Sequence, residues 1–190
     1  MFARTPRLLL RPGWREDAPA LAAALGDFAV SGKLARVPWP YRIEDAEEFL
    51  AADQTLLPNL LIFARTLGAP RLVGGIELAA NDSGVELGYW ISRPYWGLGF
   101  ATEAGRAVVD IADKALRLPQ LIASHFADNP ASARVLRKLG FEPTGKAGTR
   151  ICRARDSVEP SVEYKRSAFA RGWASPAANH GYDREGAMAA

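Results

Sequence analysis

Apolar and polar positions repeat with two different periods along the chain, and these periods divide it into strands and helices. Short runs rich in apolar and β-branched residues predict strands over residues 7–11, 59–66, 72–80, 85–92 and 120–126. Apolar positions three and four residues apart predict helices over residues 18–25, 28–36, 43–52, 101–116 and 130–139. Residues 142–167 are expected to form a closing pair of strands with a long connection.

The order of these elements predicts an α/β fold. Turn residues at 68–70 and 81–84 join three of the strands into an antiparallel meander. We expect a mixed, mostly antiparallel twisted sheet of about six to seven strands with helices on both faces. No linker interrupts the pattern, which predicts one domain over residues 1–170. Residues 171–190 lose all periodicity, and we expect a poorly ordered tail there.

Composition narrows the class of protein. The 190 residues are 48% hydrophobic and 24% charged, as is typical of soluble globular proteins. No apolar run is long enough to span a membrane, so no membrane partner is expected. A net charge of +3 suits an anionic ligand but predicts no nucleic-acid partner. The single cysteine, Cys152, fits a reducing cytoplasm. With only two histidines, His125 and His180, no metal site is expected.

A glycine turn between a strand and a helix carries the strongest chemical signal. Residues 95–104 read Y-W-G-L-G-F-A-T-E-A. Gly97 and Gly99 permit a tight turn, and the free N–H groups and dipole of the following helix favour an anion. A plain strand-to-helix turn is the alternative. A dinucleotide fingerprint would need a third glycine where Thr102 stands, and the Gly-Lys-Ser/Thr of a P-loop is absent.

The spacing of this turn resembles a known loop. Trp96, Gly99 and Ala101 stand first, fourth and sixth in a frame similar to the Q/R-x-x-G-x-G/A loop of the GNAT superfamily of acetyl-CoA-dependent N-acetyltransferases. That loop binds the pyrophosphate and pantetheine of coenzyme A through backbone N–H groups. The first position departs from the pattern, because Trp96 replaces Gln or Arg. The whole string resembles the branch that contains the ribosomal-protein N-terminal (alanine/serine) acetyltransferases.

A second block, N-P-A-S-A-R-V-L-R-K-L-G-F, covers residues 129–141. In physical terms it is an amphipathic helix with Asn129 as N-cap, Pro130 in the first position and Gly140 as its stop. It also resembles the second signature block of the same branch. There the Asn hydrogen-bonds the pantetheine arm and the Ser, here Ser132, lies near the cofactor sulfur.

The resemblance implies an enzyme, an acyltransferase that moves an acetyl group from acetyl-CoA directly to a primary amine in a ternary complex. The acceptor would be a protein N-terminus or a small amine, and the protein a monomer or homodimer. The implied cofactor-binding residues lie at the end of the strand, in the loop and in the second block: Ile91, Ser92, Trp96, Gly97, Leu98, Gly99, Phe100, Ala101, Thr102, Asn129 and Ser132.

The catalytic groups are less defined. Many GNAT members carry a Tyr acid seven residues after the Asn, but Leu136 stands there, which makes Ser132 the candidate acid or relay to the sulfur. Glu86, on the strand entering the site, is the candidate base acting through water. A Glu paired with an Arg on a sheet face is the alternative, and Glu77 is a weaker base candidate. For His125 and Cys152 structural roles are favoured.

The acceptor side remains open. The resemblance assigns its walls to residues 28–41 and 150–163, and five aromatic residues are candidates to line it: Trp39, Tyr41, Tyr89, Trp90 and Trp96. Two rival functions also remain open. One is a non-catalytic acetyl-CoA-binding sensor or scaffold, and the other is an RNA- or ribosome-associated binding protein with salt-dependent affinity.

Overall fold

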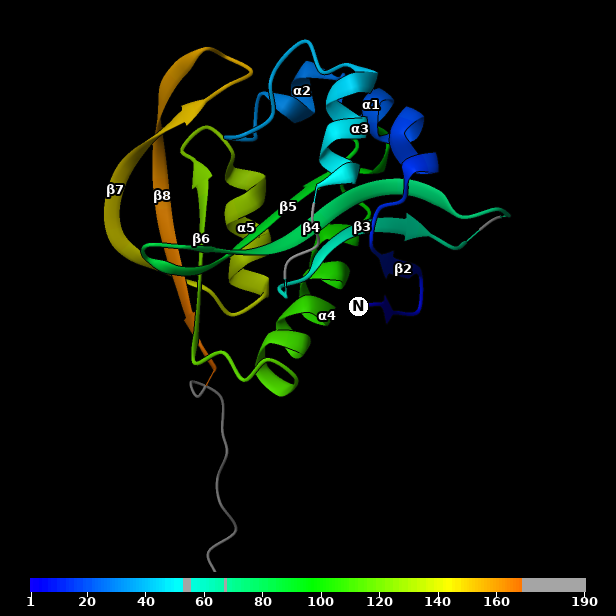
Figure 1. Ribbon diagram of the computed structural model, residues 1–190. Helices are drawn as coiled ribbons and strands as arrows, with labels where there is room; N and C mark the ends of the chain where they lie inside the picture. Colours follow the sequence, from blue (N-terminus) through cyan, green and yellow to red (C-terminus); the bar gives the residue numbers. More distant parts are fainter. Residues whose placement is uncertain (53–55, 67, 169–190) are drawn as a thin grey trace, which may run out of the picture.

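The computed structural model describes residues 1–52, 56–66 and 68–168, and a single sheet runs through them (Figure 1). The strand order is β1-β2-β3-β4-β5-β6-β8-β7. The strands are β1 (Ala3–Arg4), β2 (Leu8–Arg11), β3 (Asn59–Ala64), β4 (Arg71–Asn81), β5 (Gly84–Ile91), β6 (Gln120–Phe126), β7 (Glu142–Cys152) and β8 (Ser157–Ser167). Among the described strands, β5 and β6 are the one pair that runs in parallel. The predicted mixed, mostly antiparallel sheet is confirmed, with eight strands because the two-residue β1 is too short for a sequence pattern.

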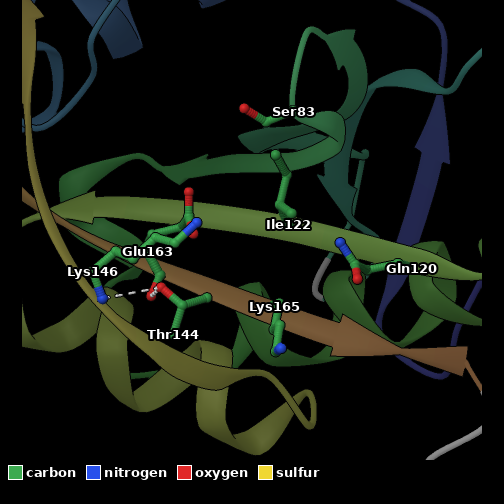
Figure 2. Close-up of a pocket in the computed structure, with 7 residues that line it drawn as sticks. All are labelled: Ser83, Gln120, Ile122, Thr144, Lys146, Glu163 and Lys165. Atoms are coloured by element: carbon green, nitrogen blue, oxygen red, sulfur yellow. Dashed lines mark hydrogen bonds between the residues drawn. The ribbon is translucent and has the colours of Figure 1, made fainter.

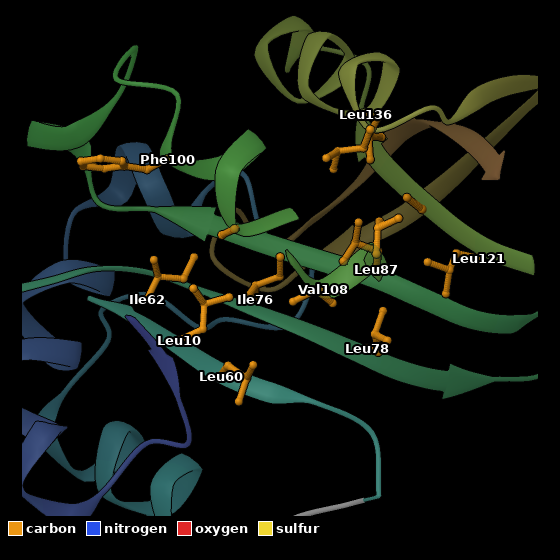
Figure 3. Packing of buried hydrophobic residues seen from close by; sticks show 14 of the residues in the cluster. Leu10, Leu60, Ile62, Ile76, Leu78, Leu87, Phe100, Val108, Leu121 and Leu136 are labelled. Carbon is orange, nitrogen blue, oxygen red and sulfur yellow. The ribbon is translucent and has the colours of Figure 1, made fainter. Parts of the chain in front are cut away.

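Five α-helices cover the sheet from both sides: α1 (Ala18–Leu25), α2 (Phe28–Ser31), α3 (Ile43–Ala51), α4 (Phe100–Lys114) and α5 (Pro130–Lys138). Helix α4 has a buried stripe at every fourth residue, Ala104, Val108 and Ala112, which packs on one face of the sheet with α5 (Figure 3). Helices α1 and α3 bury their apolar sides on the other face.

The alternation of β2 shows how the sequence divides between the two faces. Leu8 and Leu10 are fully buried in the cluster under α4, while Leu9 packs with the cluster under α1 and α3. Successive strand residues point to opposite faces, so both neighbours of Leu9 lie on the α4 side. Burial of one such leucine contributes about 1.5–3 kcal/mol. Both layers of the fold therefore depend on the same short strand.

The closing strands differ from the prediction. A turn of only four residues, 153–156, joins β7 to β8, so the expected long connection is wrong. β7 is an 11-residue strand whose pairing with β8 is irregular between Pro143 and Ala147. Pro143, Gly145 and Gly148 interrupt the apolar pattern, so the sequence did not show that this mostly exposed strand runs unbroken to Cys152. The hairpin is therefore two long strands, with β8 between β6 and β7.

One helix prediction also needs correction. Helix α2 ends at Ser31, because Gly32 is its C-cap, so it is shorter than the expected 28–36. Asp17 precedes α1 but does not cap it with its side chain, which instead accepts hydrogen bonds from Arg11 and the Trp14 N–H. The predicted tail, residues 171–190, lies outside the described residues. Within the described ranges no helix is long and apolar enough to cross a membrane.

Candidate active site

The glycine turn after β5 opens α4 without a side-chain cap. A 3-10 turn (Arg93–Tyr95) leads into it, and Gly97 and Gly99 have φ of 77° and 81°, a region that other residues avoid. Gly99 is the N-cap of α4, and no side chain bonds the first amides of the helix. The N–H groups of residues 100–102 lack intrahelical partners and remain available to an anion, which the helix dipole favours.

The strands β5 and β6 stop pairing before they reach this turn. Their parallel pairing is registered only at Glu86 and Ile122, whereas β5 follows β4 as far as Ile91. Ser92 donates its N–H to the Val73 carbonyl at 2.9 Å. Because bonded pairs alternate along an antiparallel ladder, Ile91 directs its N–H and its carbonyl away from β4, toward the β6 side. The end of β5 thus offers backbone hydrogen-bonding groups beside the glycine turn.

Trp96 closes onto these groups. Its indole Nε1 donates to the Ile91 carbonyl at 2.6 Å, although 49% of Trp96 is exposed. The Ser92 carbonyl accepts the Tyr95 N–H at 3.0 Å, so both backbone polar groups of Ser92 are used within the chain. The Ile91 N–H has no ladder partner. Trp96, in the position that Gln or Arg occupies in the family loop, therefore fixes the loop to the strand.

Asn129 and Ser132 begin α5 in a different way. The Asn129 side chain accepts the Ser132 N–H at 3.3 Å, which confirms it as N-cap. The Ser132 Oγ lies 2.7 Å from the hydroxyl of Tyr89, and this hydroxyl also donates to the Ser132 carbonyl at 3.1 Å. Burial raises the pKa of Tyr89 to about 12, opposed by the Ser132 hydrogen bond. Tyr89 is therefore a neutral hydroxyl partner of Ser132.

Sequence reasoning missed this role for Tyr89 and considered it only for the acceptor groove. Strand parity holds the signal. Tyr89 is one residue from Gly88 and Trp90, so it points to the opposite face, toward α5. Trp90 packs with the α1–α3 cluster instead.

The sequence also matches a known protein family over most of its length. A family model described as "Acetyltransferase (GNAT) domain" matches residues 7–142. The chain belongs to the GNAT acetyltransferase family. This confirms the predicted family and enzyme class, an acyltransferase, and GNAT enzymes use acetyl-CoA. The chain is also 30% identical over 153 residues to an uncharacterized N-acetyltransferase, YoaA, of Bacillus subtilis. The aligned region covers 74% of this chain and 82% of that protein.

Solved structures share the GNAT fold. A GNAT acetyltransferase from Bacillus anthracis superposes with a TM-score of 0.75 at 23% identity, covering 88% of this chain and 99% of the other. The ribosomal-protein-S5-alanine acetyltransferase from Vibrio fischeri gives 0.74 at 16% identity, with 90% and 98% covered. The microcin C7 self-immunity acetyltransferase MccE, solved with acetyl-CoA and AMP, gives 0.71 at 16% identity, with 86% and 93% covered. At these identities they establish the fold alone.

The two candidate bases of this GNAT protein sit in ion pairs. Arg150 holds both carboxylate oxygens of Glu86, at 2.8 and 3.0 Å. Ser124 and Asn81 donate to the same carboxylate at 2.8 and 3.0 Å. Glu86 lies five residues before Ile91, about 16 Å along the strand. It is thus a mostly covered carboxylate, held by three side chains at a distance from the glycine turn.

Glu77 lies nearer to the end of β5. It pairs with Gly88 across the β4–β5 ladder, and its carboxylate lies against the space that a Cβ at Gly88 would fill. The exposed Arg36, from the loop after α2, forms an ion pair with it. Glu77 and Arg36 join the sheet face to one of the expected acceptor walls.

The two expected acceptor walls touch each other. The Arg153 N–H donates to the Ala35 carbonyl at 3.1 Å, and the Arg155 Nε donates to the Gly32 carbonyl at 2.7 Å. The Cys152 thiol contacts the carbonyls of Gly32 and Leu34 and is fully buried. Cys152 therefore joins the α2 loop to the β7–β8 turn and is not presented as a nucleophile.

Ion pairs fix α2 above the ends of β5 and β6. Arg93, just after β5, lies 3.8 Å from Asp27 at the start of α2. Lys33, just after α2, lies 2.9 Å from Asp128, which follows β6. Helix α2 therefore bridges the two strands where their pairing has ended. Exposed Phe28 on this helix packs edge-on against Trp39.

A polar hollow of about 310 Å³ lies elsewhere on the sheet (Figure 2). It is lined by Ser83, Gln120, Ile122, Thr144, Lys146, Glu163 and Lys165. Gln120 begins β6, whose amino end is remote from the glycine turn, so the hollow is separate from the cofactor loop. Within the described ranges, no group of three or more His, Cys, Asp or Glu residues is arranged to hold a metal.

His125 is half-buried among structural contacts. Its Nδ1 lies 2.8 Å from the Phe126 carbonyl, and its ring lies tilted against Tyr164 with 5.3 Å between the ring centroids. Among the described residues, its buried Nε2 has no hydrogen-bond partner. These contacts are of the structural kind that the sequence favours for His125.

Proposed function

We propose that this protein transfers the acetyl group of acetyl-CoA directly to a primary amine, with the pyrophosphate on the glycine turn and the pantetheine arm along the end of β5. The observation that carries the proposal is the pairing of two unfilled backbone sites. One is the uncapped start of α4 and the other is the Ile91 N–H on the β6 side of β5, next to the Ile91 carbonyl that Trp96 occupies. Residues 96–102 bind the phosphates in this proposal, and Ile91 and Ser92 end the strand that guides the arm.

The chemistry requires that one proton leave the amine and one reach the sulfur. The amine nitrogen bonds to the acetyl carbonyl carbon, the carbon–sulfur bond breaks, and the thiolate of coenzyme A leaves. Ser132 donates a hydrogen bond to this sulfur, or relays to it a proton that solvent replaces on the hydroxyl, while Asn129 contacts the pantetheine. The hydrogen bond between Ser132 and Tyr89 supports this role, because it fixes the hydroxyl at the start of α5.

Glu86 accepts the amine proton through water in this proposal. Its contacts with Arg150 and Ser124 hold the carboxylate in place. Glu77 is the alternative base, because it lies closer to the end of β5 and only the exposed Arg36 holds it. Glu86→Gln and Glu77→Gln separate the two. The variant that lacks the true base loses its rate of acetyl transfer, and the variant of the other carboxylate keeps the wild-type rate.

The acceptor is a protein N-terminus or a small amine. Similarity of fold to the ribosomal-protein-S5-alanine acetyltransferase of Vibrio fischeri supports the first. Helix α2 and the aromatic pair Phe28–Trp39 border the ends of β5 and β6, and an acceptor would enter there.

Thiol release from acetyl-CoA with a panel of peptides and small amines tests the proposal. We expect turnover with at least one amine, and a rise in melting temperature on addition of coenzyme A. A protein that binds coenzyme A but releases thiol with no amine would be a sensor or scaffold. A melting temperature that coenzyme A leaves unchanged would refute cofactor binding itself.

A further inference from the structure

Arg7, just before β2, reaches the glycine turn from a distant part of the chain. Its Nη1 donates to the Leu98 carbonyl at 3.0 Å, and its guanidinium stacks on the Phe100 ring at 4.7 Å. Its Nη2 also lies nearest to the point where a Cβ at Gly99 would stand, at 3.5 Å. Arg7 therefore contacts Leu98 and Phe100 and lies beside Gly99 between them, and the proposed function assigns all three residues to cofactor binding.

The first turn of α4 holds Arg7 in turn. Glu103 accepts the Arg7 Nε at 2.7 Å and the Arg7 backbone N–H at 3.0 Å, and the Thr5 hydroxyl at 2.5 Å. Burial raises the pKa of the Glu103 carboxyl, but the hydrogen bonds from Thr5 and Arg7 outweigh it and leave the pKa below its usual value. Glu103 is thus ionised at neutral pH, and it directs the planar fork of Arg7 at the loop.

The geometry of one peptide unit shows what this contact does. In a trans peptide the carbonyl and the following N–H point in opposite directions. A Leu98 carbonyl held by Arg7 therefore turns the Gly99 N–H to the opposite side. Glycine adopts positive and negative φ with little difference in energy, so this peptide unit could rotate cheaply if nothing held it.

We propose that Arg7 is a positioning residue for the cofactor: by holding the Leu98 carbonyl it aims the Gly99 N–H at the pyrophosphate of acetyl-CoA. This inference rests on the proposed function. Trp96 cannot supply such a restraint at Leu98, because its indole is bonded to the Ile91 carbonyl. The cation that orients this loop thus comes from the start of β2, while the first loop position carries an indole.

Arg7→Met tests the role of the fork, because methionine keeps an apolar stem over Phe100 and removes the hydrogen bonds. Isothermal calorimetry with coenzyme A, together with kcat and KM for acetyl-CoA, gives the readout. We expect Kd and KM for the cofactor to rise about 10-fold, with kcat changed less than about two-fold. Arg4→Met, the same change on the neighbouring strand β1, is the matched control and should keep the wild-type Kd.

Two further measurements separate positioning from charge and from general damage. Arg7→Lys keeps the charge but cannot bond Glu103 and Leu98 with one planar fork, so most of the loss should remain. Acetyl-pantetheine lacks the pyrophosphate, so wild type and Arg7→Met should use it with equal kcat/KM. A wild-type Kd in Arg7→Met, full function in Arg7→Lys, or an equal loss with acetyl-pantetheine would each overturn the inference.

Binding of coenzyme A by the wild type separates the role of Arg7 from cofactor binding itself. If wild-type protein does not bind coenzyme A, the proposed function is wrong. If wild type binds it and Arg7→Met binds it equally well, only the role of Arg7 is wrong. Should Arg7→Met not fold, Arg7→Lys gives the same comparison with the charge retained.

Discussion

The starts of α4 and α5 solve the same problem in opposite ways. Each helix follows a strand and begins with amide groups that lack partners inside the helix. At α4 the N-cap is Gly99, with φ of 81°, and no side chain bonds the first turn. At α5, Asn129 caps the Ser132 N–H, and Pro130 has no N–H to satisfy. The chain therefore completes α5 with its own side chains and leaves α4 to an outside ligand.

The difference separates two kinds of contribution to the site. The start of α4 supplies backbone groups and a dipole, so its geometry matters more than its side chains. The start of α5 supplies a side chain, Ser132, whose position depends on Asn129 and Tyr89. Substitutions at α4 should therefore act on cofactor affinity, and substitutions at α5 on the rate of transfer or on stability.

The largest effect is expected at Gly99. Gly99→Glu forces a side chain into a left-handed conformation and places a negative charge at the anion-binding turn. We expect KM for acetyl-CoA to rise more than about 100-fold, measured by thiol release. Gly145→Glu is the matched control, because Gly145 lies in β7 and its φ of 77° is close to the 81° of Gly99. The control should lose comparable stability and keep its KM. An unchanged KM in Gly99→Glu would mean that the pyrophosphate binds elsewhere.

The second effect concerns Tyr89. Tyr89→Phe removes the hydroxyl that holds Ser132 at 2.7 Å and leaves the aromatic ring. If Ser132 serves the departing sulfur, kcat should fall about 10-fold while KM for acetyl-CoA stays within about two-fold. Ser132→Ala should reduce kcat at least as much, and the double variant should lose nothing further. Additive losses in the double variant would show that the two hydroxyls act independently.

This contrast also explains what the sequence could predict. The glycine turn and the capped helix are local, because Gly97, Gly99, Asn129 and Pro130 act on their own neighbours in the chain. Their geometry follows from φ preferences and capping, and the structure confirms it. Helix and strand periods likewise predicted the order of elements and both faces of the sheet.

The contacts that sequence could not predict join residues far apart in the chain. Arg7 and Leu98 are 91 positions apart, and Glu86 and Arg150 are 64 apart. No local pattern encodes such a partner. The closing pair of strands was predicted, but the length of β7 was not, since its pairing with β8 stabilises an exposed segment that contains Pro143 and two glycines. Propensity opposed this strand, and the long ladder outweighed it.

A smaller effect separates the capping role of Asn129 from a role in cofactor binding. Asn129→Ala removes the cap and should lower stability by about 1 kcal/mol, a fall of about 2–4 °C in Tm. Asn129→Asp keeps a capping oxygen but loses the amide donor, so its Tm should match the wild type. If Asn129 contacts pantetheine with its amide, both variants should raise KM for acetyl-CoA. If the residue is a cap only, KM in Asn129→Asp should equal that of the wild type.

The smallest effect is a dependence of stability on alkaline pH. Burial raises the pKa of Tyr89 from 10.0 to about 12, so the folded protein keeps the phenol proton that the unfolded chain releases above pH 10. This contribution is complete below pH 10 and is lost as the pH rises from 10 toward 12. The Tm of Tyr89→Phe should therefore fall less than that of the wild type over that range. Burial also raises the pKa of Tyr41 to about 12, so part of the decline should remain in the variant.

Because Tyr89 stays neutral below pH 10, its removal should lower kcat by the same factor at pH 7 and pH 9. A factor that changes between these pH values would mean that Tyr89 titrates during the reaction. The start of α5 would then take part in proton transfer and would not merely hold Ser132, in contrast to the start of α4, which binds the donor.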